Sequence, residues 1–315
     1  MSVPTAPHGD GLGQVAHVWV DGRLQPADGT HLSVFDRGFQ LGDGVFETLR
    51  VRGAHPTELA EHIARLRNSA AGLDIPLPAD LEARLTNGIA ELLAADGLDG
   101  PAGDASVRIT VSRGPFRGRG LLPPDEVVEA TVAIQAWPVL PPPGNHLEQG
   151  LHLVASAVRR DPSNPIVTLK TTSRADYVYA RLEARRAGAD DALFLTVDGH
   201  LSEGTTANIF LVRRAGADGT AELATPSLDC AILPGTTRSW LLAWGARVGL
   251  RPFEGRLSRT DLAAADEAFL SSSVAGVLPV TRFEGTAVGT GRPGPWTRRA
   301  RDDREAMIRA GEDGP

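Results

Sequence analysis

The sequence predicts a mixed α/β fold, α+β in detail, arranged as two domains. Three observations support this class: the chain has 315 residues, strand-like and helix-like hydrophobic patterns alternate along it, and residues 137–145 form a proline-rich break. Consecutive prolines can neither continue a helix nor donate the hydrogen bonds of a sheet. We therefore expect a flexible N-terminal arm at 1–14, a small α/β domain at 15–136, a linker at 137–149 and a larger C-terminal domain at 150–315.

The first half is predicted to hold several strands and two amphipathic helices. Runs of β-branched and alternating residues predict the strands, and Asp21-Gly22 is typical of the tight turn of a hairpin. Apolar residues recur every three or four positions in both helices, as a helix with one buried face requires. Strands are expected at 17–20, 45–52, 106–112 and 130–136, and helices at 57–73 and 79–96.

The second half is predicted to alternate strands and helices. Asp198-Gly199 indicates a turn that joins strands 192–197 and 207–212 into a hairpin. Ser173 and Asp176 have the spacing of a capping box at the start of a helix. Further strands are expected at 151–157, 166–169 and 267–271, and helices at 173–187, 236–248 and 296–309.

The composition excludes several functional classes. A net charge of −7 and a pI near 5.6 offer no basic surface for nucleic acid, and no stretch approaches the roughly 18 apolar residues that span a bilayer. The N-terminal residues lack a basic segment followed by an apolar one, so no secretory signal is expected. Cys230 is the only cysteine and can form no internal disulfide, which favours a cytoplasmic location. We expect no nucleic-acid partner, no membrane partner and no metal site.

Lys170 stands out because it is the only lysine among 32 basic residues. Arginine can replace lysine wherever a positive charge suffices, but it cannot lose its proton or form an imine. Lys170 follows the mostly apolar residues 166–169 and precedes a predicted helix N-terminus, and both surroundings disfavour an ammonium ion. These features predict a nucleophilic amine with Schiff-base chemistry. The alternative is a solvated lysine that survived by chance.

Two further patterns fit a phosphate-bearing molecule held at this lysine. Residues 234–237 (Pro-Gly-Thr-Thr) open a helix with backbone and hydroxyl donors, and Ser271-Ser272-Ser273 follows a predicted strand. In isolation, these patterns are also typical of a helix cap and of a polar turn. Glu203 could supply a carboxylate for a protonated ring nitrogen, or it could be a solvated glutamate of a loop.

Several segments then occur in one order along the chain: DRGFQLGDGVFETLR (36–50), HIARL (62–66), Lys170, EGTTANIF (203–210) and ILPGTTR (232–238). In order and spacing they resemble the motifs of the class IV aminotransferases, which are fold-type IV enzymes dependent on pyridoxal 5′-phosphate (PLP). The resemblance covers about residues 15–285. It implies two α/β domains that enclose the cofactor at their interface, and a homodimer that completes the pocket.

The resemblance also implies a role for each matched residue. Lys170 falls where the family's catalytic lysine holds PLP as an internal aldimine, and Glu203 falls on the carboxylate that pairs with the pyridine nitrogen. Once freed by an incoming amino acid, the lysine amine would move protons as general base and acid. The remaining cofactor-binding residues implied are Leu233 for the ring, and Arg65, Gly235, Thr236, Thr237, Ser272 and Ser273 for the phosphate.

Within the family, the motifs favour a transaminase that moves an amino group between a D-amino acid, or an (R)-amine, and a 2-keto acid by a ping-pong mechanism. Asp36-Arg37-Gly38 and the run 42–44 (Gly-Asp-Gly) resemble the D-amino acid transaminases and the lyases of the family more than the branched-chain enzymes. Gly118-Arg119-Gly120 and Arg174 resemble the 4-amino-4-deoxychorismate lyases, which make p-aminobenzoate and pyruvate. A branched-chain L-amino acid aminotransferase and a PLP-binding protein without turnover are also compatible with the motifs.

Loop 113–123 is the predicted site for the substrate carboxylate. Arg117 and Arg119 could bind it through paired hydrogen bonds, with a mobile, solvated loop as the alternative. The D-amino acid enzymes have a histidine in this region, and this chain lacks it. They also have a tyrosine in the pocket, where this chain has Phe46. Phe46, Arg117 and Arg119 are therefore the candidate substrate-binding residues, and the loop could act in its own or the partner subunit.

Overall fold

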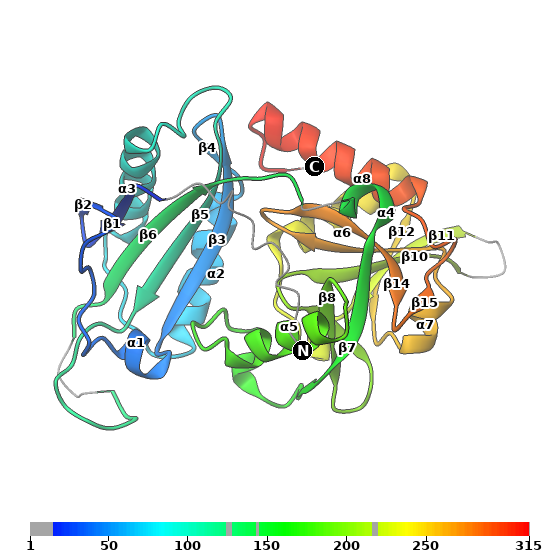
Figure 1. The fold of residues 1–315 in the computed structure, drawn as a ribbon, viewed down its shortest axis with the longest axis horizontal. Coiled ribbons are helices and arrows are strands. Elements are labelled where there is room, and N and C mark those ends of the chain that lie inside the picture. The colour runs from blue at the N-terminus through cyan, green and yellow to red at the C-terminus, as the bar shows by residue number, and fades with distance from the viewer. Residues whose placement is uncertain (1–14, 124–127, 143–144, 216–219, 315) are drawn as a thin grey trace, which may run out of the picture.

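The computed structural model describes residues 15–123, 128–142, 145–215 and 220–314. Figure 1 shows two β-sheets, one from each half of the chain, with helices packed against both. The predicted mixed α/β class is confirmed by this arrangement. The predicted arm at 1–14 lies outside the described residues, and the division into domains at 137–149 stays a prediction.

The N-terminal half forms a six-stranded antiparallel sheet. Its elements are β1 (His17–Val20), β2 (Arg23–Pro26), α1 (Arg37–Leu41), β3 (Gly44–Arg52), β4 (His55–Pro56), α2 (Leu59–Ala71), α3 (Leu81–Ala95), β5 (Asp104–Ser112) and β6 (Thr131–Pro138), in the sheet order β2-β1-β6-β5-β3-β4. Helices α2 and α3 bury their apolar stripes against one face of this sheet. Successive residues of a strand face opposite sides, so Ser106 and Arg108 of β5 point away from these helices, whereas Val107 and Ile109 enter the core.

The C-terminal half forms a nine-stranded sheet that closes on itself. Its strands are β7 (Leu151–Arg160), β8 (Asp191–Thr196), β9 (Leu201–Gly204), β10 (Asn208–Ala215), β11 (Thr220–Pro226), β12 (Arg251–Gly255), β13 (Glu267–Ser272), β14 (Gly276–Phe283) and β15 (Thr286–Ala287). The order is β12-β11-β10-β13-β14-β7-β8-β9, and β15 pairs with β14. Because Glu203 of β9 also pairs with Asn208 of β10, the strands from β10 to β9 form a closed ring.

Helices cover the outside of this second sheet. They are α4 (His146–Gln149), α5 (Ala175–Arg186), α6 (Thr236–Val248), α7 (Arg259–Ala263) and α8 (Pro295–Ala310), with short 3-10 helices at Pro165–Thr168 and Leu228–Cys230. Trp240, Leu241 and Trp244 of α6 pack with residues of α8 in one apolar cluster. None of the helices in the described ranges is long and apolar enough to cross a membrane.

Three local predictions in this half are wrong. Residues 166–169 do not form a buried strand, because Asn164 accepts a hydrogen bond from the Ile166 N–H and begins a 3-10 helix. Ser173 and Asp176 form no capping box, since α5 begins after Arg174 without a side-chain cap. The predicted hairpin of 192–197 and 207–212 contains a further strand, β9, which pairs with both.

The C-terminal helix α8 ties the two halves together. Figure 1 shows it extending from the second sheet toward β4 of the first. Glu305 accepts hydrogen bonds from Arg50 of β3, and Arg304 pairs with Glu58, the residue before α2, at 2.7 Å. Just beyond the helix, Asp313 accepts a 2.7 Å hydrogen bond from the backbone N–H of Glu58. Ion pairs and a hydrogen bond therefore connect α8 and the residues after it to the first half.

Candidate active site

A cavity of about 400 Å³ collects side chains from both sheets. Every predicted cofactor residue lines it, as does Phe46: Arg65, Lys170, Glu203, Leu233, Gly235, Thr236, Thr237, Ser272 and Ser273. A larger, open cleft of about 1520 Å³ beside it is bordered by α8 and residues 137–142. That cleft touches neither Lys170 nor Glu203, so the predicted chemistry belongs to the smaller cavity.

The backbone of Lys170 is held by two elements of the N-terminal half, α2 and β3. Its N–H donates to the Ser69 hydroxyl of α2 at 3.0 Å, and its carbonyl accepts from the Phe46 N–H of β3 at 2.9 Å. The side chain then lies over the Phe46 ring, with Nζ 4.7 Å from the ring centroid. An extended segment bridged to β3, rather than a buried strand of its own, therefore presents the amine to the cavity.

The surroundings of Lys170 favour the neutral amine. Burial lowers the pKa of Lys170 to about 8, and the nearby charges of Arg65 and Arg174 act in the same direction against Glu47 and Glu203. At pH 7 roughly one such amine in ten is neutral, against about one in three thousand for a lysine in water. A neutral amine is a nucleophile and a base, so the site provides what imine chemistry requires.

Glu203 lies at the closure of the second sheet. Its carboxylate accepts hydrogen bonds from the Leu233 N–H at 2.9 Å, from Arg160 and Tyr177 at 3.3 Å each, and from Asn208 at 3.5 Å. Burial raises the pKa of Glu203 above its ordinary value, opposed by Arg160 and the Leu233 N–H. The group is thus a buried acceptor that can share a proton with a basic atom in the cavity.

The start of α6 brings hydrogen-bond donors to the cavity wall, and we call its residues Gly235, Thr236 and Thr237 the α6 cup. Gly235 precedes the helix without any side-chain cap, so the first backbone N–H groups of α6 have no capping partner. Thr236 and Ser273 bring their hydroxyls within 3.2 Å of each other. A Cβ at position 235 would lie 2.2 Å from the Asn208 Oδ1, which explains the glycine. Ser271 also lines the cavity, and its buried hydroxyl has no hydrogen-bond partner within the described ranges.

Arg65 lies beside this cup and is held there rigidly. Its guanidinium binds both carboxylate oxygens of Glu47, at 2.7 and 2.6 Å, and donates to the Pro234 carbonyl at 2.8 Å. Burial opposes ionisation of Glu47, but hydrogen bonds from Arg65 and His62 outweigh it and lower the pKa of Glu47 to about 2. The pair therefore stays charged at neutral pH and fixes a cation next to Thr236 and its neighbours.

Two arginines that line the cavity have no anionic partner in the part of the chain that the structure describes. Arg108 of β5 stacks 3.9 Å from the centroid of the Phe46 ring, and Arg174 stacks 3.1 Å from that of Tyr177. Among the described residues neither arginine forms an ion pair, although Arg174 donates to the Thr205 carbonyl at 2.9 Å. Burial lowers the pKa of Arg108, and so does the nearby Arg174. Sequence reasoning missed Arg108, whose only signal is its alternation with buried residues in β5.

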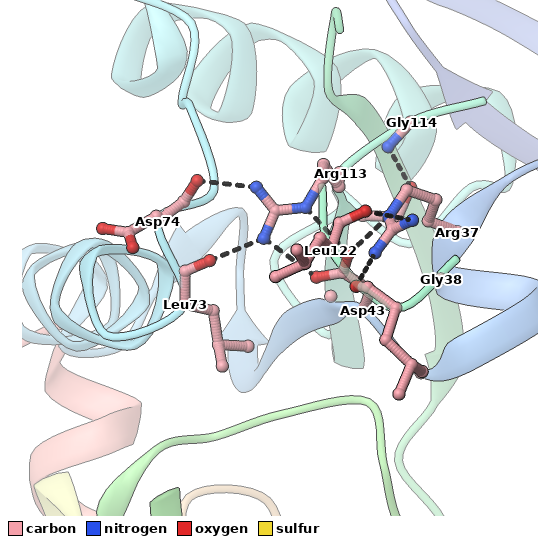
Figure 2. Close-up of polar contacts among 12 residues, drawn as sticks. Arg37, Gly38, Asp43, Leu73, Asp74, Arg113, Gly114 and Leu122 are labelled. Carbon is pink, nitrogen blue, oxygen red and sulfur yellow. Dashed lines mark hydrogen bonds and ion pairs between the residues drawn. The ribbon is translucent and has the colours of Figure 1, made fainter. Parts of the chain in front are cut away.

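Loop 113–123 does not bring its arginines to the cavity. Arg117 and Arg119 are exposed and absent from its lining, contrary to the position that the sequence predicts for them. Figure 2 shows how the loop is held: Asp43 binds both Arg37 and Arg113 at 2.7 Å. Arg37 also donates to the backbone carbonyls of Gly120, Leu121 and Leu122, while Arg113 donates to those of Leu73 and Asp74.

Comparison with known sequences points to one family. The family described as Amino-transferase class IV matches residues 44–283. A D-alanine aminotransferase of Bacillus licheniformis is 31% identical over 285 residues, which are 89% of this chain and 93% of that protein. The family match therefore includes all the residues that line the cavity.

Comparison with solved structures agrees. A branched-chain amino acid aminotransferase of Escherichia coli superposes with a TM-score of 0.85 at 27% identity, covering 95% of this chain and 96% of that one. A 4-amino-4-deoxychorismate lyase of Pseudomonas aeruginosa superposes with a TM-score of 0.76 at 33% identity, covering 92% and 98% of the two chains. Relatives with three different activities thus share this fold.

Proposed function

This chain belongs to the class IV aminotransferases, and from that premise we propose that it transfers the amino group of a D-amino acid to a 2-keto acid. PLP is the cofactor of the family. The observation that carries the proposal is the meeting of Lys170, Glu203, the α6 cup and two unpaired arginines in one cavity. The amine and the carboxylate suit the cofactor, and the arginines suit an acidic substrate.

The residues present fit PLP. Donors for a phosphate come from the first N–H groups of α6, from Arg65, and from the hydroxyls of Thr236, Thr237, Ser272 and Ser273. The Ser271 hydroxyl, which has no partner among the described residues, adds one more. Leu233 lines the same cavity and would pack against the aromatic ring of the cofactor. When bound, PLP supplies an electron sink for the bonds of the substrate Cα.

The chain's own groups would then handle the protons. Glu203 would hold a proton on a basic ring nitrogen beside it, since its buried carboxylate gains from any cation placed there. Lys170, with a pKa of about 8, would take a proton from the substrate Cα and deliver it to the cofactor C4′. Phe46 and Tyr177 would exclude water from the space above Lys170, because both rings line the same cavity.

Arg108 and Arg174 are the proposed carboxylate-binding residues, in place of Arg117 and Arg119. Two uncompensated guanidinium groups facing one cavity attract an anion and can bind a carboxylate through paired hydrogen bonds. Thr48 and Ser106 add further polar atoms to this wall. A cavity so lined suits a small or acidic side chain better than a branched aliphatic one.

A branched-chain L-amino acid aminotransferase is the second candidate function. It is favoured by the similarity to the Escherichia coli enzyme of that name, whereas the D configuration is supported by the D-alanine aminotransferase relative and by the motifs at 36–38 and 42–44. (R)-Amines are proposed as additional donors, although they offer no carboxylate to the two arginines.

Enantiopure donors test the proposal. The purified enzyme is incubated with D-alanine, D-glutamate, L-leucine or an (R)-amine and 2-oxoglutarate or pyruvate, and the amino acid product is resolved by chiral chromatography. D-donors are expected to react fastest. Turnover of L-leucine alone would support the second candidate, and release of pyruvate and p-aminobenzoate from aminodeoxychorismate would identify a lyase.

A homodimer and a cytoplasmic location complete the proposal. Large apolar side chains are exposed on two adjoining segments, 32–41 and 121–122, among them Phe39 at 73% and Leu122 at 85%. Exposed apolar surface of this extent supports a protein–protein interface. The single cysteine, Cys230, is buried and unpaired, which supports a reducing compartment.

A further inference from the structure

We propose that Arg304, on the C-terminal helix α8, is a positioning residue for the phosphate end of the cavity. Its side chain is fully buried and contacts two other elements: Nη1 lies 2.7 Å from Glu58 before α2, and Nη2 lies 3.4 Å from the Thr237 Oγ1 at the start of α6. Arg304 does not line the cavity itself. The inference rests on the proposed function only in assigning the phosphate to Thr236 and Thr237.

Arg304 determines which way the Thr237 hydroxyl can act. A guanidinium only donates hydrogen bonds, so the Thr237 oxygen must be the acceptor in this contact. The single O–H of Thr237 is then left to donate elsewhere, and Thr237 lines the cavity. Donation is what an anion requires. Without Arg304 the hydroxyl could turn and donate into the protein, where it would no longer serve a phosphate.

Glu58 holds Arg304 in place. The Glu58 side chain is buried, and its backbone has a φ of 54°, a left-handed conformation that costs a non-glycine residue free energy. Two contacts with the C-terminal segment maintain this conformation: the ion pair with Arg304 and the hydrogen bond from the Glu58 N–H to Asp313. A buried pair of opposite charges in close contact has a well-defined geometry, so Arg304 is aimed at Thr237.

Helix α2 thereby supports the cup from two sides. Arg65, within α2, reaches the Pro234 carbonyl just before the cup and is held by Glu47. Glu58, at the start of the same helix, holds Arg304 behind Thr237. One helix of the N-terminal half therefore positions both cations that flank the first turn of α6. The arrangement couples the contact between the halves to binding of the phosphate.

Binding of PLP and pyridoxal to the apoenzyme tests this inference, since pyridoxal lacks the phosphate. Dissociation constants are measured from the absorbance change for Arg304→Met, Arg304→Lys and a control, Glu305→Gln. The control breaks the neighbouring ion pair between α8 and Arg50 without touching Thr237. We expect both Arg304 variants to weaken PLP binding about tenfold, the scale of one charge-assisted hydrogen bond, with pyridoxal binding changed less than about twofold.

Three results would overturn the inference. In the first, the Arg304 variants weaken the binding of PLP and of pyridoxal by the same factor. In the second, Glu305→Gln weakens PLP binding as much as the Arg304 variants do. In the third, Arg304→Lys prefers PLP over pyridoxal as strongly as the wild type does. The lysine variant decides alone if Arg304→Met does not fold, because its ammonium keeps a charge opposite Glu58 but cannot span both partners. Wild-type enzyme that binds PLP no better than pyridoxal would instead refute the phosphate assignment of the proposed function, and this inference with it.

Discussion

Lys170 and Phe46 contact each other twice, through a backbone hydrogen bond and through their side chains. The Phe46 N–H donates to the Lys170 carbonyl at 2.9 Å, and the Lys170 Nζ lies 4.7 Å from the centroid of the Phe46 ring. The amine is therefore positioned by β3 of the N-terminal sheet, although Glu203 and the α6 cup belong to the C-terminal half. The position of Lys170 therefore depends on the packing of the two halves against each other.

Replacing Lys170 by arginine is expected to abolish activity. Arginine keeps the charge and roughly the length but cannot form an imine or give up its proton. The variant should lose turnover and the yellow colour of the bound cofactor while its melting temperature stays near that of the wild type. The readouts are the absorbance spectrum and a coupled assay. A variant that transaminates at the normal rate would refute the mechanism.

The reaction of the apoenzyme with PLP should depend on the protonation of Lys170. Because only the neutral amine attacks and its pKa is about 8, the rate of colour return should rise as the pH rises through about 8 and then level off. Arg174→Gln removes a neighbouring positive charge. Because the Lys170 ammonium ion is then more stable, the midpoint of the pH profile moves to higher pH. Stopped-flow absorbance measures this shift. Arg117→Gln, at an exposed position, is the control, and an unmoved midpoint in Arg174→Gln would contradict the electrostatic argument.

Glu203→Gln should slow catalysis while leaving the cofactor bound. The amide keeps the size of the side chain but cannot stabilise a proton on a ring nitrogen, and loss of such an electrostatic contact costs about 100- to 1000-fold in kcat. Single-turnover kinetics with an amino donor measures the loss. Tyr177→Phe removes only a hydroxyl 3.3 Å from the Glu203 Oε1 and should cost much less. Equal rates for Glu203→Gln and wild type would exclude the proposed role.

The carboxylate site can be mapped with paired arginine variants. Arg108→Gln and Arg174→Gln are each expected to raise KM for the keto acid about 10- to 100-fold, because each loses a charge-assisted hydrogen bond worth roughly 1.5–3 kcal/mol. Arg117→Gln and Arg119→Gln should leave KM unchanged, since both side chains are exposed outside the cavity. Steady-state kinetics decides between the two sets. A raised KM in the loop variants would show that loop 113–123 reaches a substrate, in its own subunit or in a partner.

Disrupting the exposed apolar segments should separate the proposed dimer. Phe39→Glu and Leu122→Glu place a charge on side chains that are 73% and 85% exposed in the single chain. If these side chains lie in an interface, burying the charges is unfavourable and the protein becomes a monomer in sedimentation experiments. Val197→Glu, at another exposed apolar position, should leave the oligomeric state unchanged. Variants that sediment like the wild type would exclude this surface as the interface.

Long periodic segments were predictable, whereas short buried ones were not. Helices α2, α3 and α8 carry apolar residues at helical spacing over three or more turns, and their predicted bounds agree within a few residues. The strand β9 is only four residues long and entirely buried, so it shows no alternation. Residues 166–169 are apolar enough for a strand, but Pro165 and the Asn164 side chain begin a 3-10 helix instead.

The proposed phosphate end of the site could be predicted from the sequence, whereas the proposed carboxylate end could not. Gly235, Thr236 and Thr237 could be found because a helix N-terminus is a local feature that brings its donors together by itself. Arg108 could not, because the face of β5 opposite the helices becomes a cavity wall only when the second half packs there. Arg117 and Arg119 have the right chemistry for a carboxylate, but a loop sequence does not state which way its side chains point.

The hydrogen bonds that hold loop 113–123 do not depend on the side chains of residues 121 and 122. Arg37 binds only main-chain carbonyls at residues 120–122, so the bonds to Leu121 and Leu122 do not depend on their side chains, whereas Gly120 has a φ of 134° that favours glycine. Asp43 in turn fixes Arg37 from the segment that leads into β3. The side chains at positions 121 and 122 can therefore be changed without loss of these hydrogen bonds. The attachment of the loop is thus separate from the apolar surface that Leu121 and Leu122 present, and a change in that surface leaves Lys170 and its surroundings the same.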